Sequence, residues 1–434
     1  MGASSAQVVD RLGSADRAVL ASDQGAAPLQ IAVLLEFDGA DRPTSEELRA
    51  LLAARLHRVP RLRQRLVVPE HRLAAPRWIA ARDVDLGWHL RCIEGLAFDS
   101  RPTLHEYVAD LLCEPLDHHR PLWRATLLCD EDRRVHALVV VLHHVLADGM
   151  AGLAALAALT DSGTDALEPT QPTAPHFRFW HRMDGLAELS AGSWPRPTPR
   201  ISLTAPTGSR RRISVIRRPL AEVTELAHQF HAKVNDVLLT AVTGALLRVL
   251  RRRGECPGRL VVSVPIASAP DVDSGSGNKA AEDSGYPAGN HVGARLITVP
   301  AIVNDAARLR FIARETRQQR ATLRRASSAV PLGIAFRVIA GLGLFSWFIE
   351  HQRLVHTFVS NLRGPSGRLS FGGCEVSHLT PMSVTPGNIG ITFTALSYAG
   401  ELTLTIVTDP GVCDPDEVAD AASDTLAELA AALR

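Results

Sequence analysis

Residues 137–149 read ALVVVLHHVLADG: six apolar residues, two histidines and, three residues later, an Asp-Gly pair. An unbroken apolar run of this kind is typical of a strand that is covered on both faces. From Met150 to Leu159 a helical pattern of small apolar residues follows. Two imidazoles, a carboxylate and a glycine therefore lie between a buried strand and a helix, a suitable place for proton-transfer chemistry.

Side chains alternate between the two faces of a strand, so His143 and His144 are expected to point in opposite directions. One imidazole can enter a cavity as a general base, because histidine titrates near neutral pH. The other would pack behind it and hydrogen-bond the backbone. Asp148 can orient an imidazole or pair with an arginine, and Gly149 allows backbone or substrate to approach closely.

These residues also allow other interpretations. The two histidines can also be ordinary core residues, packed and hydrogen-bonded. A metal site built from His143, His144 and Asp148 is disfavoured, because neighbouring strand residues diverge. The chain has no GxSxG elbow, so direct attack by an acceptor on an activated acyl donor fits better than a covalent serine mechanism. A second pair, His118-His119, has no Asp-Gly after it and is predicted to lie outside the site, in a polar turn.

The composition limits the class of protein. A length of 434 residues favours two or three domains. The formal charge of +1 gives no overall positive field, so nucleic acid is not an expected partner. Six scattered cysteines without a CxxC pair fit a reducing compartment. The N-terminus lacks the basic start and apolar core of a signal peptide, and we expect a cytoplasmic protein.

Helices and strands are predicted in both halves of the chain, which gives a mixed α/β class with short antiparallel pairs. Trp88 and His89 are expected on a strand, and Asn235 or Asp236 is expected to cap the helix that begins at Val237. Apolar patterns predict strands over residues 31–37, 66–68, 124–128, 135–143, 213–216, 260–266, 293–299, 355–360, 369–371, 374–379, 389–398 and 401–408. Helical periodicity predicts helices over residues 44–57, 103–113, 220–230, 237–251, 304–326 and 415–433.

Three segments depart from these patterns. Residues 161–175 are rich in proline, threonine and acidic residues and are predicted to be a linker. Residues 270–289 are predicted to form a polar loop. Residues 333–349 are strongly apolar but contain Arg337. They favour a buried helix, or a helix that lines a lipid cavity or lies on a membrane surface, over a membrane span.

Four motifs in order resemble those of a known family. The HHxxxDG pattern of residues 143–149 matches the CoA-dependent acyltransferase superfamily. Residues 115–123 resemble the PLDxxRPLW motif of bacterial wax ester synthase/diacylglycerol acyltransferases. Residues 235–239 (NDVLL) resemble that family's NDVVLA motif, and residues 360–365 (SNLRGP) resemble its SNVPGP motif. With the strand-rich tail, the resemblance covers nearly the whole chain.

This resemblance implies a fold and an activity. It implies an α/β fold of two chloramphenicol-acetyltransferase-like domains with mixed sheets and an active site in a tunnel at their interface. We therefore expect an N-terminal domain over residues 1–160, a crossover linker over 161–212 and a C-terminal domain over 213–434. The implied reaction is acyl transfer from acyl-CoA, the co-substrate, to a long-chain alcohol or a diacylglycerol. No resident cofactor and no metal are expected.

The resemblance also implies roles for single residues. His144 would be the base that deprotonates the acceptor hydroxyl, with His143 and Asp148 in support, beside Gly149. Asn235 and Asn361 fall on family motifs and are candidates to line the site. Their alternative roles are a helix cap for Asn235 and a turn for Asn361. Three residues of the PLDxxRPLW motif are expected to be structural: Asp117, Arg120 and Trp123. Candidates to pair with Asp148 are Arg17, Arg124 and Arg363.

One departure leaves the acceptor open. Leu362-Arg363 stands where the family has Val-Pro, and Arg363 would suit an anionic acceptor or a CoA phosphate. Acylation of a specialised metabolite or of a carrier-bound acceptor is therefore a second hypothesis. A third is a non-catalytic lipid-binding relative. With a lipophilic acceptor, peripheral association with the inner face of a membrane or with a lipid droplet is expected.

Overall fold

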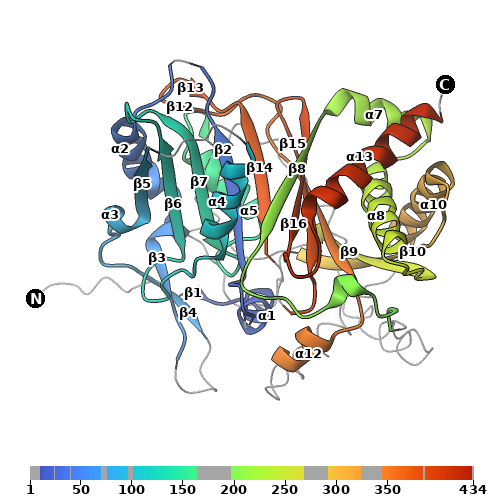
Figure 1. Ribbon diagram of the computed structural model, residues 1–434. Helices are drawn as coiled ribbons and strands as arrows, with labels where there is room; N and C mark the ends of the chain where they lie inside the picture. Colours follow the sequence, from blue (N-terminus) through green and yellow to red (C-terminus); the bar gives the residue numbers. More distant parts are fainter. Residues whose placement is uncertain are drawn as a thin grey trace, which may run out of the picture.

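The apolar run forms β7 (Val135–His143), the middle strand of a five-stranded sheet (Figure 1). Seven of its nine side chains are buried, which explains why the sequence is almost continuously apolar. Antiparallel partners flank it on both sides, and one edge strand pairs in parallel. In spatial order the sheet consists of β14 (His378–Ser383), β2 (Gln30–Glu36), β7, β6 (Trp123–Cys129) and β5 (Leu90–Glu94).

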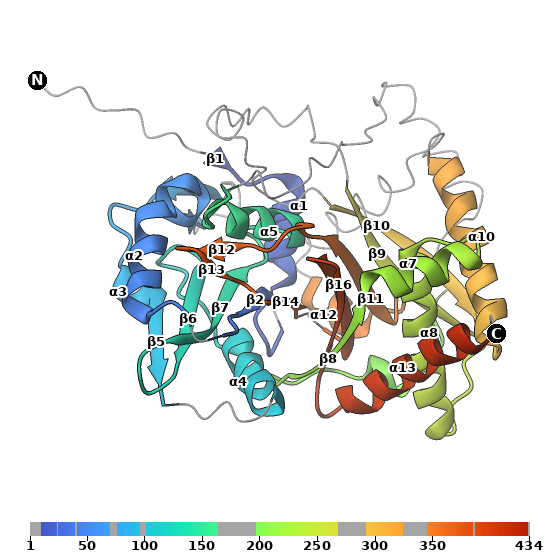
Figure 2. The same cartoon turned by 90° about the horizontal axis from the view of Figure 1, so that it is seen from above.

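A second, six-stranded sheet lies beside the first (Figures 1 and 2). Its strands pair in both directions, so this sheet is also mixed. In spatial order it consists of β10 (Val292–Pro300), β9 (Arg259–Ala267), β11 (Thr357–Arg363), β15 (Ile391–Tyr398), β16 (Glu401–Thr408) and β8 (Arg212–Pro219). The mixed α/β fold with two domains is confirmed.

This computed structural model describes residues 10–23, 25–39, 41–69, 76–95, 101–163, 197–267, 292–323, 345–384 and 387–432. Most of the predicted linker, the loop at 270–289 and most of the apolar segment 333–349 lie outside them. Within the described residues, no helix is long and apolar enough to span a membrane.

Each sheet has its own apolar core, and helices of both halves surround the two sheets. Those of the first half are α1 (Ser14–Ser22), α2 (Ser45–Arg55), α3 (Leu86–His89), α4 (Arg101–Cys113) and α5 (Gly149–Ala158). Those of the second half are α7 (Leu220–Gln229), α8 (Val234–Arg252), α10 (Asp305–Leu323), α12 (Phe345–His351) and α13 (Pro415–Ala431). Minor strands form two small sheets: β1 (Asp10–Arg11) with β4 (Arg77–Ala80) and β3 (Gln64–Val67), and β12 (Ser370–Phe371) with β13 (Cys374–Glu375).

One strand of the C-terminal half, β14, belongs to the sheet of the N-terminal half. β14 follows β11 along the chain but leaves the second sheet and pairs antiparallel with β2 of the first. It also packs against β15 and β16, so it lies where the two halves meet (Figures 1 and 2). Arg217 of β8 forms an ion pair with Glu36 of β2 across the same junction. The domain boundaries stay a prediction, but residues 378–383 pair with the N-terminal half.

Two local predictions are wrong. Trp88 and His89 lie on the short helix α3, which Asp85 caps by accepting a hydrogen bond from the Trp88 amide at 3.2 Å. Helix α8 begins at Val234, so neither Asn235 nor Asp236 is its N-cap. Asp236 instead accepts a hydrogen bond from the Lys233 amide at 2.9 Å, from inside the first turn. In both cases the helix includes residues that the apolar pattern alone did not assign to it.

Candidate active site

The HHxxxDG segment begins at the last residue of β7 and is held by backbone hydrogen bonds. The His143 amide donates to the Leu122 carbonyl at 3.0 Å, and the His144 amide donates to the Leu29 carbonyl at 3.0 Å. A turn starts at His144, where the Leu146 amide donates back to the His143 carbonyl at 2.9 Å. The chain therefore leaves the sheet in a fixed direction just where the two imidazoles stand.

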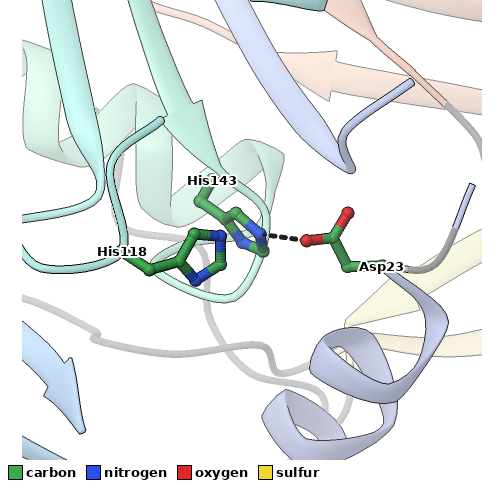
Figure 3. Close-up of side chains that lie close together, drawn as sticks. All are labelled: Asp23, His118 and His143. Carbon is green, nitrogen blue, oxygen red and sulfur yellow. Dashed lines mark hydrogen bonds and ion pairs between the residues drawn. The ribbon is translucent and has the colours of Figure 1, made fainter. Parts of the chain in front are cut away.

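The ring of His143 is buried and both of its nitrogens are engaged. Nδ1 accepts a hydrogen bond from the Val145 amide at 3.1 Å. Because Nδ1 is an acceptor, the proton of the neutral ring lies on Nε2, which donates to Oδ2 of Asp23 at 2.8 Å (Figure 3). His143 has no nitrogen left to receive a proton from a substrate without losing one of these bonds.

Asp23 is a site residue that the sequence did not reveal. It follows α1, in a segment that is only loosely similar to the opening segment of the family, and its carboxylate points at His143 (Figure 3). Its other oxygen accepts from the Leu29 amide at 2.7 Å. Burial raises the pKa of this carboxyl group, but the hydrogen bonds from His143 and Leu29 and the nearby imidazoles together bring the pKa below its ordinary value of 3.8.

His118 also lies at the site, contrary to its predicted place outside it. Its ring meets the His143 ring edge to face, with ring centroids 5.6 Å apart (Figure 3). Burial and the neighbouring His143 lower the pKa of His118. One nitrogen or oxygen from each of Asp23, His118 and His143 lies within 4.8 Å of the others. A metal ion would have to bind Nε2 of His143, and the ring proton would then have to move to Nδ1, which already accepts the Val145 amide. The hydrogen bond between His143 and Asp23 therefore fits this arrangement better than a metal centre.

His144 differs from its neighbour because it is only half-buried. Its Nδ1 atom is buried, so the Nε2 edge of the ring is the better candidate for contact with a substrate. The predicted division between the two histidines matches their surroundings, with His143 enclosed and His144 partly open. The catalytic role of His144 stays a prediction.

Asp148 and Gly149 begin α5. Asp148 is the N-cap and accepts a hydrogen bond from the Ala151 amide at 2.9 Å. Arg124, one of its predicted partners, is instead paired with Glu114 at 2.7 Å. A Cβ atom added to Gly149 would lie 3.0 Å from Cδ2 of Leu362. The glycine of the HHxxxDG motif therefore packs against the SNLRGP motif, and two motifs more than 200 residues apart meet at the junction of the two halves.

The two candidate asparagines take different positions. Asn235 is half-buried in the first turn of α8. Asn361 is exposed and lies within β11, opposite Ala395 of β15, so the turn predicted for it is wrong. The chain turns only after Gly364, where an added Cβ would approach the Ser397 carbonyl to 2.6 Å. Whether either asparagine contacts a substrate stays a prediction.

The PLDxxRPLW residues surround the start of β6. Arg120 forms ion pairs with Asp85 at 3.0 Å and with Asp117 at 3.4 Å. Trp123 is buried, and its Nε1 donates to the Leu62 carbonyl at 2.8 Å. These contacts fix the loop that carries His118 and the neighbouring strand. The structural role expected for the motif stays a prediction.

Comparison with known proteins decides the family. Residues 12–192 match the model of the wax ester synthase/diacylglycerol acyltransferase catalytic domain, and residues 288–430 match that of the WS/DGAT C-terminal domain. The chain belongs to the wax ester synthase/diacylglycerol acyltransferase family. The chain is thus an O-acyltransferase, as the motifs predicted.

Relatives and solved structures agree with this family. The chain is 28% identical to the "probable diacylglycerol O-acyltransferase tgs1" of Mycobacterium tuberculosis, over 93% of this chain and 91% of that one. Its fold is similar to that of the wax ester synthase/diacylglycerol acyltransferase from Marinobacter aquaeolei VT8, with a TM-score of 0.71, 20% identity and coverage of 97% and 98%. The first condensation domain of the calcium-dependent antibiotic synthetase is also similar, with a TM-score of 0.66, 16% identity and coverage of 98% and 96%.

Proposed function

We propose that this enzyme transfers an acyl group from acyl-CoA to the hydroxyl group of a lipophilic acceptor, a long-chain alcohol or a diacylglycerol. Family membership and the similarity to tgs1 support an acceptor of this class. The proposal includes no resident cofactor and no metal, with acyl-CoA as the co-substrate. Such an acceptor resides in a membrane or a lipid droplet, so we also expect peripheral association, which co-sedimentation with phospholipid vesicles tests.

We assign the general base to Nε2 of His144. The observation that carries this assignment is the state of His143, whose two ring nitrogens are both engaged. In the proposed step, His144 takes the hydroxyl proton as the oxygen attacks the thioester carbonyl. The tetrahedral intermediate then releases CoA thiolate, which takes the proton from His144. The products are an ester and free CoA, and a base at hydrogen-bond distance contributes roughly 10²- to 10⁴-fold in rate.

The test measures CoA release with a thiol-reactive dye while palmitoyl-CoA is offered with hexadecanol or dioleoylglycerol. Ester formation is confirmed by mass spectrometry. We expect turnover with at least one acceptor and a loss of roughly 10²- to 10⁴-fold in kcat for His144→Ala. A His144→Ala enzyme as active as the wild type would refute the base. Absence of turnover with both acceptors would refute the acceptor class.

A second acceptor class has one observation in its favour. Arg363 is exposed at the end of β11, next to Leu362, which packs against Gly149. A guanidinium on the strand whose Leu362 contacts the HHxxxDG segment would suit an anionic or carrier-bound acceptor. A screen of hydroxylated small molecules by mass spectrometry distinguishes the two classes. Conversion of such molecules alone, without hexadecanol or dioleoylglycerol, would favour the second.

A further inference from the structure

Asp23 and Leu29 together hold both histidines of the HHxxxDG segment, because Leu29 is bonded to Asp23 and to His144. Leu29 donates its amide to the Asp23 carboxylate at 2.7 Å and accepts the His144 amide on its carbonyl at 3.0 Å. The second oxygen of the same carboxylate receives Nε2 of His143 at 2.8 Å (Figure 3). Asp23 is therefore bonded to the ring of one histidine and, through Leu29, to the backbone of the other.

We infer that Asp23 is a positioning residue of acyl transfer, which fixes the His143 ring and the backbone of His144 without touching the substrate. This inference rests on the proposed role of His144 as the base. No sequence motif marks Asp23, and the carboxylate lies about 120 residues from the histidines along the chain. Its contribution is to keep the strand end and the turn after it in one geometry.

The chemistry of the site requires a carboxylate rather than another acceptor. The two groups hydrogen-bonded to the Asp23 carboxylate are both donors, the Nε2–H of His143 and the N–H of Leu29. An amide at this position offers one acceptor oxygen and one donor nitrogen, so it can satisfy only one of them and opposes the other. His143 cannot adapt by moving its proton, because the Val145 amide already donates to Nδ1. Asp23→Asn therefore retains size while removing half of the interaction.

Loss of the carboxylate is expected to disturb His144 more than the fold. Leu29 itself is buried, and its carbonyl accepts the His144 amide, so a shift of Leu29 would also move the backbone of the base. A displacement of about 1 Å at a catalytic group can lower the rate by roughly 10²-fold. The inference places Asp23 out of contact with the substrate, so the expected loss falls on kcat and not on KM.

The test compares Asp23→Asn and Asp23→Ala with Asp38→Ala, which removes an exposed carboxylate beyond the other end of β2. We expect kcat to fall roughly 10- to 100-fold in Asp23→Ala and less in Asp23→Asn, with the KM for palmitoyl-CoA unchanged within about twofold. Asp38→Ala retains the wild-type kcat. In the double variant Asp23→Ala/His143→Ala, the loss falls short of the product of the two single losses, because the two side chains form one unit.

The outcomes separate the inference from the proposed function. If both Asp23 variants retain the wild-type kcat while His144→Ala is inactive, the positioning role is refuted and the base stands. An active His144→Ala enzyme refutes the base and this inference with it. If Asp23→Ala does not fold, Asp23→Asn, close to the native side chain in size, decides. Activity that EDTA abolishes and Zn²⁺ restores would show a metal at Asp23, His118 and His143, and would also refute the inference.

Discussion

His89 shows how one buried side chain couples stability to pH. Its ring is fully buried, stacks on Trp123 with centroids 4.3 Å apart, and donates from Nδ1 to the Trp123 carbonyl at 2.8 Å. Burial lowers the pKa of His89 from 6.5 to about 4. The unfolded chain therefore binds a proton below pH 6.5 that the folded chain does not bind until about pH 4.

The contribution of His89 to the free energy of unfolding is expected to be fully present above pH 6.5 and to be lost as the pH falls toward 4. The full difference is about 3 kcal/mol. Urea unfolding at pH 7.5, 6, 5 and 4 measures this difference. His89→Phe should flatten the dependence over this range, whereas His57→Gln, which changes an exposed histidine, should leave it unchanged. Equal pH dependence in the wild type and His89→Phe would contradict the assignment.

Gly364 offers a second test at the same scale. A Cβ atom there would meet the Ser397 carbonyl oxygen at 2.6 Å, and this oxygen also accepts the Gly364 amide at 2.9 Å. Backbone would have to move, so Gly364→Ala should lower the free energy of unfolding by about 1–3 kcal/mol. Gly367→Ala is the matched control, because nothing lies within 4 Å of its added Cβ. Chemical denaturation of both variants checks the difference, and similar losses would contradict it.

At the scale of elements, the sequence predicted those helices and strands whose signals come from residues close together along the chain. Helix α2 begins within one residue of its predicted start, because its cap, Thr44, and the partner of that cap, Glu47, lie only three residues apart. β7 was recognisable because a strand buried on both faces needs an apolar run. The contacts of Asp23 and His118 with His143 could not be predicted, since they join segments that only the folded sheet brings together. The apolar pattern ends at residue 360, so Asn361 was expected in a turn. This expectation was wrong because β11 continues to Arg363.

The α2 cap gives a prediction at this scale. The Thr44 hydroxyl accepts from the Glu47 amide at 3.3 Å, and Glu47 accepts from the Thr44 amide at 2.9 Å. Thr44→Ala should lower the free energy of unfolding by about 1 kcal/mol, because an amide of the first turn loses its acceptor. Thr224→Ala, inside α7, should cause no such loss, since alanine has the higher helix propensity. Equal effects in thermal unfolding would argue against the cap.

For the whole molecule, the decisive feature is the position of β14 in the first sheet, which no local sequence pattern indicated. The motifs predicted two domains, and two sheets with separate cores are present. The place of β14 in the first sheet was not predicted, because the sequence pattern indicated a strand over residues 374–379 and said nothing of its partner. Its position means that the five-stranded sheet is complete only when residues 378–383 have left the second half.

The position of β14 in the first sheet should make the two halves unfold together. Removing β14 from the first sheet would expose the edge of β2. The chain on either side of β14 leads to strands of the second sheet, β11 before it and β15 after it. The ion pair of Arg217 with Glu36 adds a further link. Differential scanning calorimetry of the full chain should therefore show one transition. Arg217→Met should lower Tm while the transition stays single, because it removes the ion pair but leaves the strand pairing intact. Two resolved transitions in the wild type would mean that each half is stable without the strand they share.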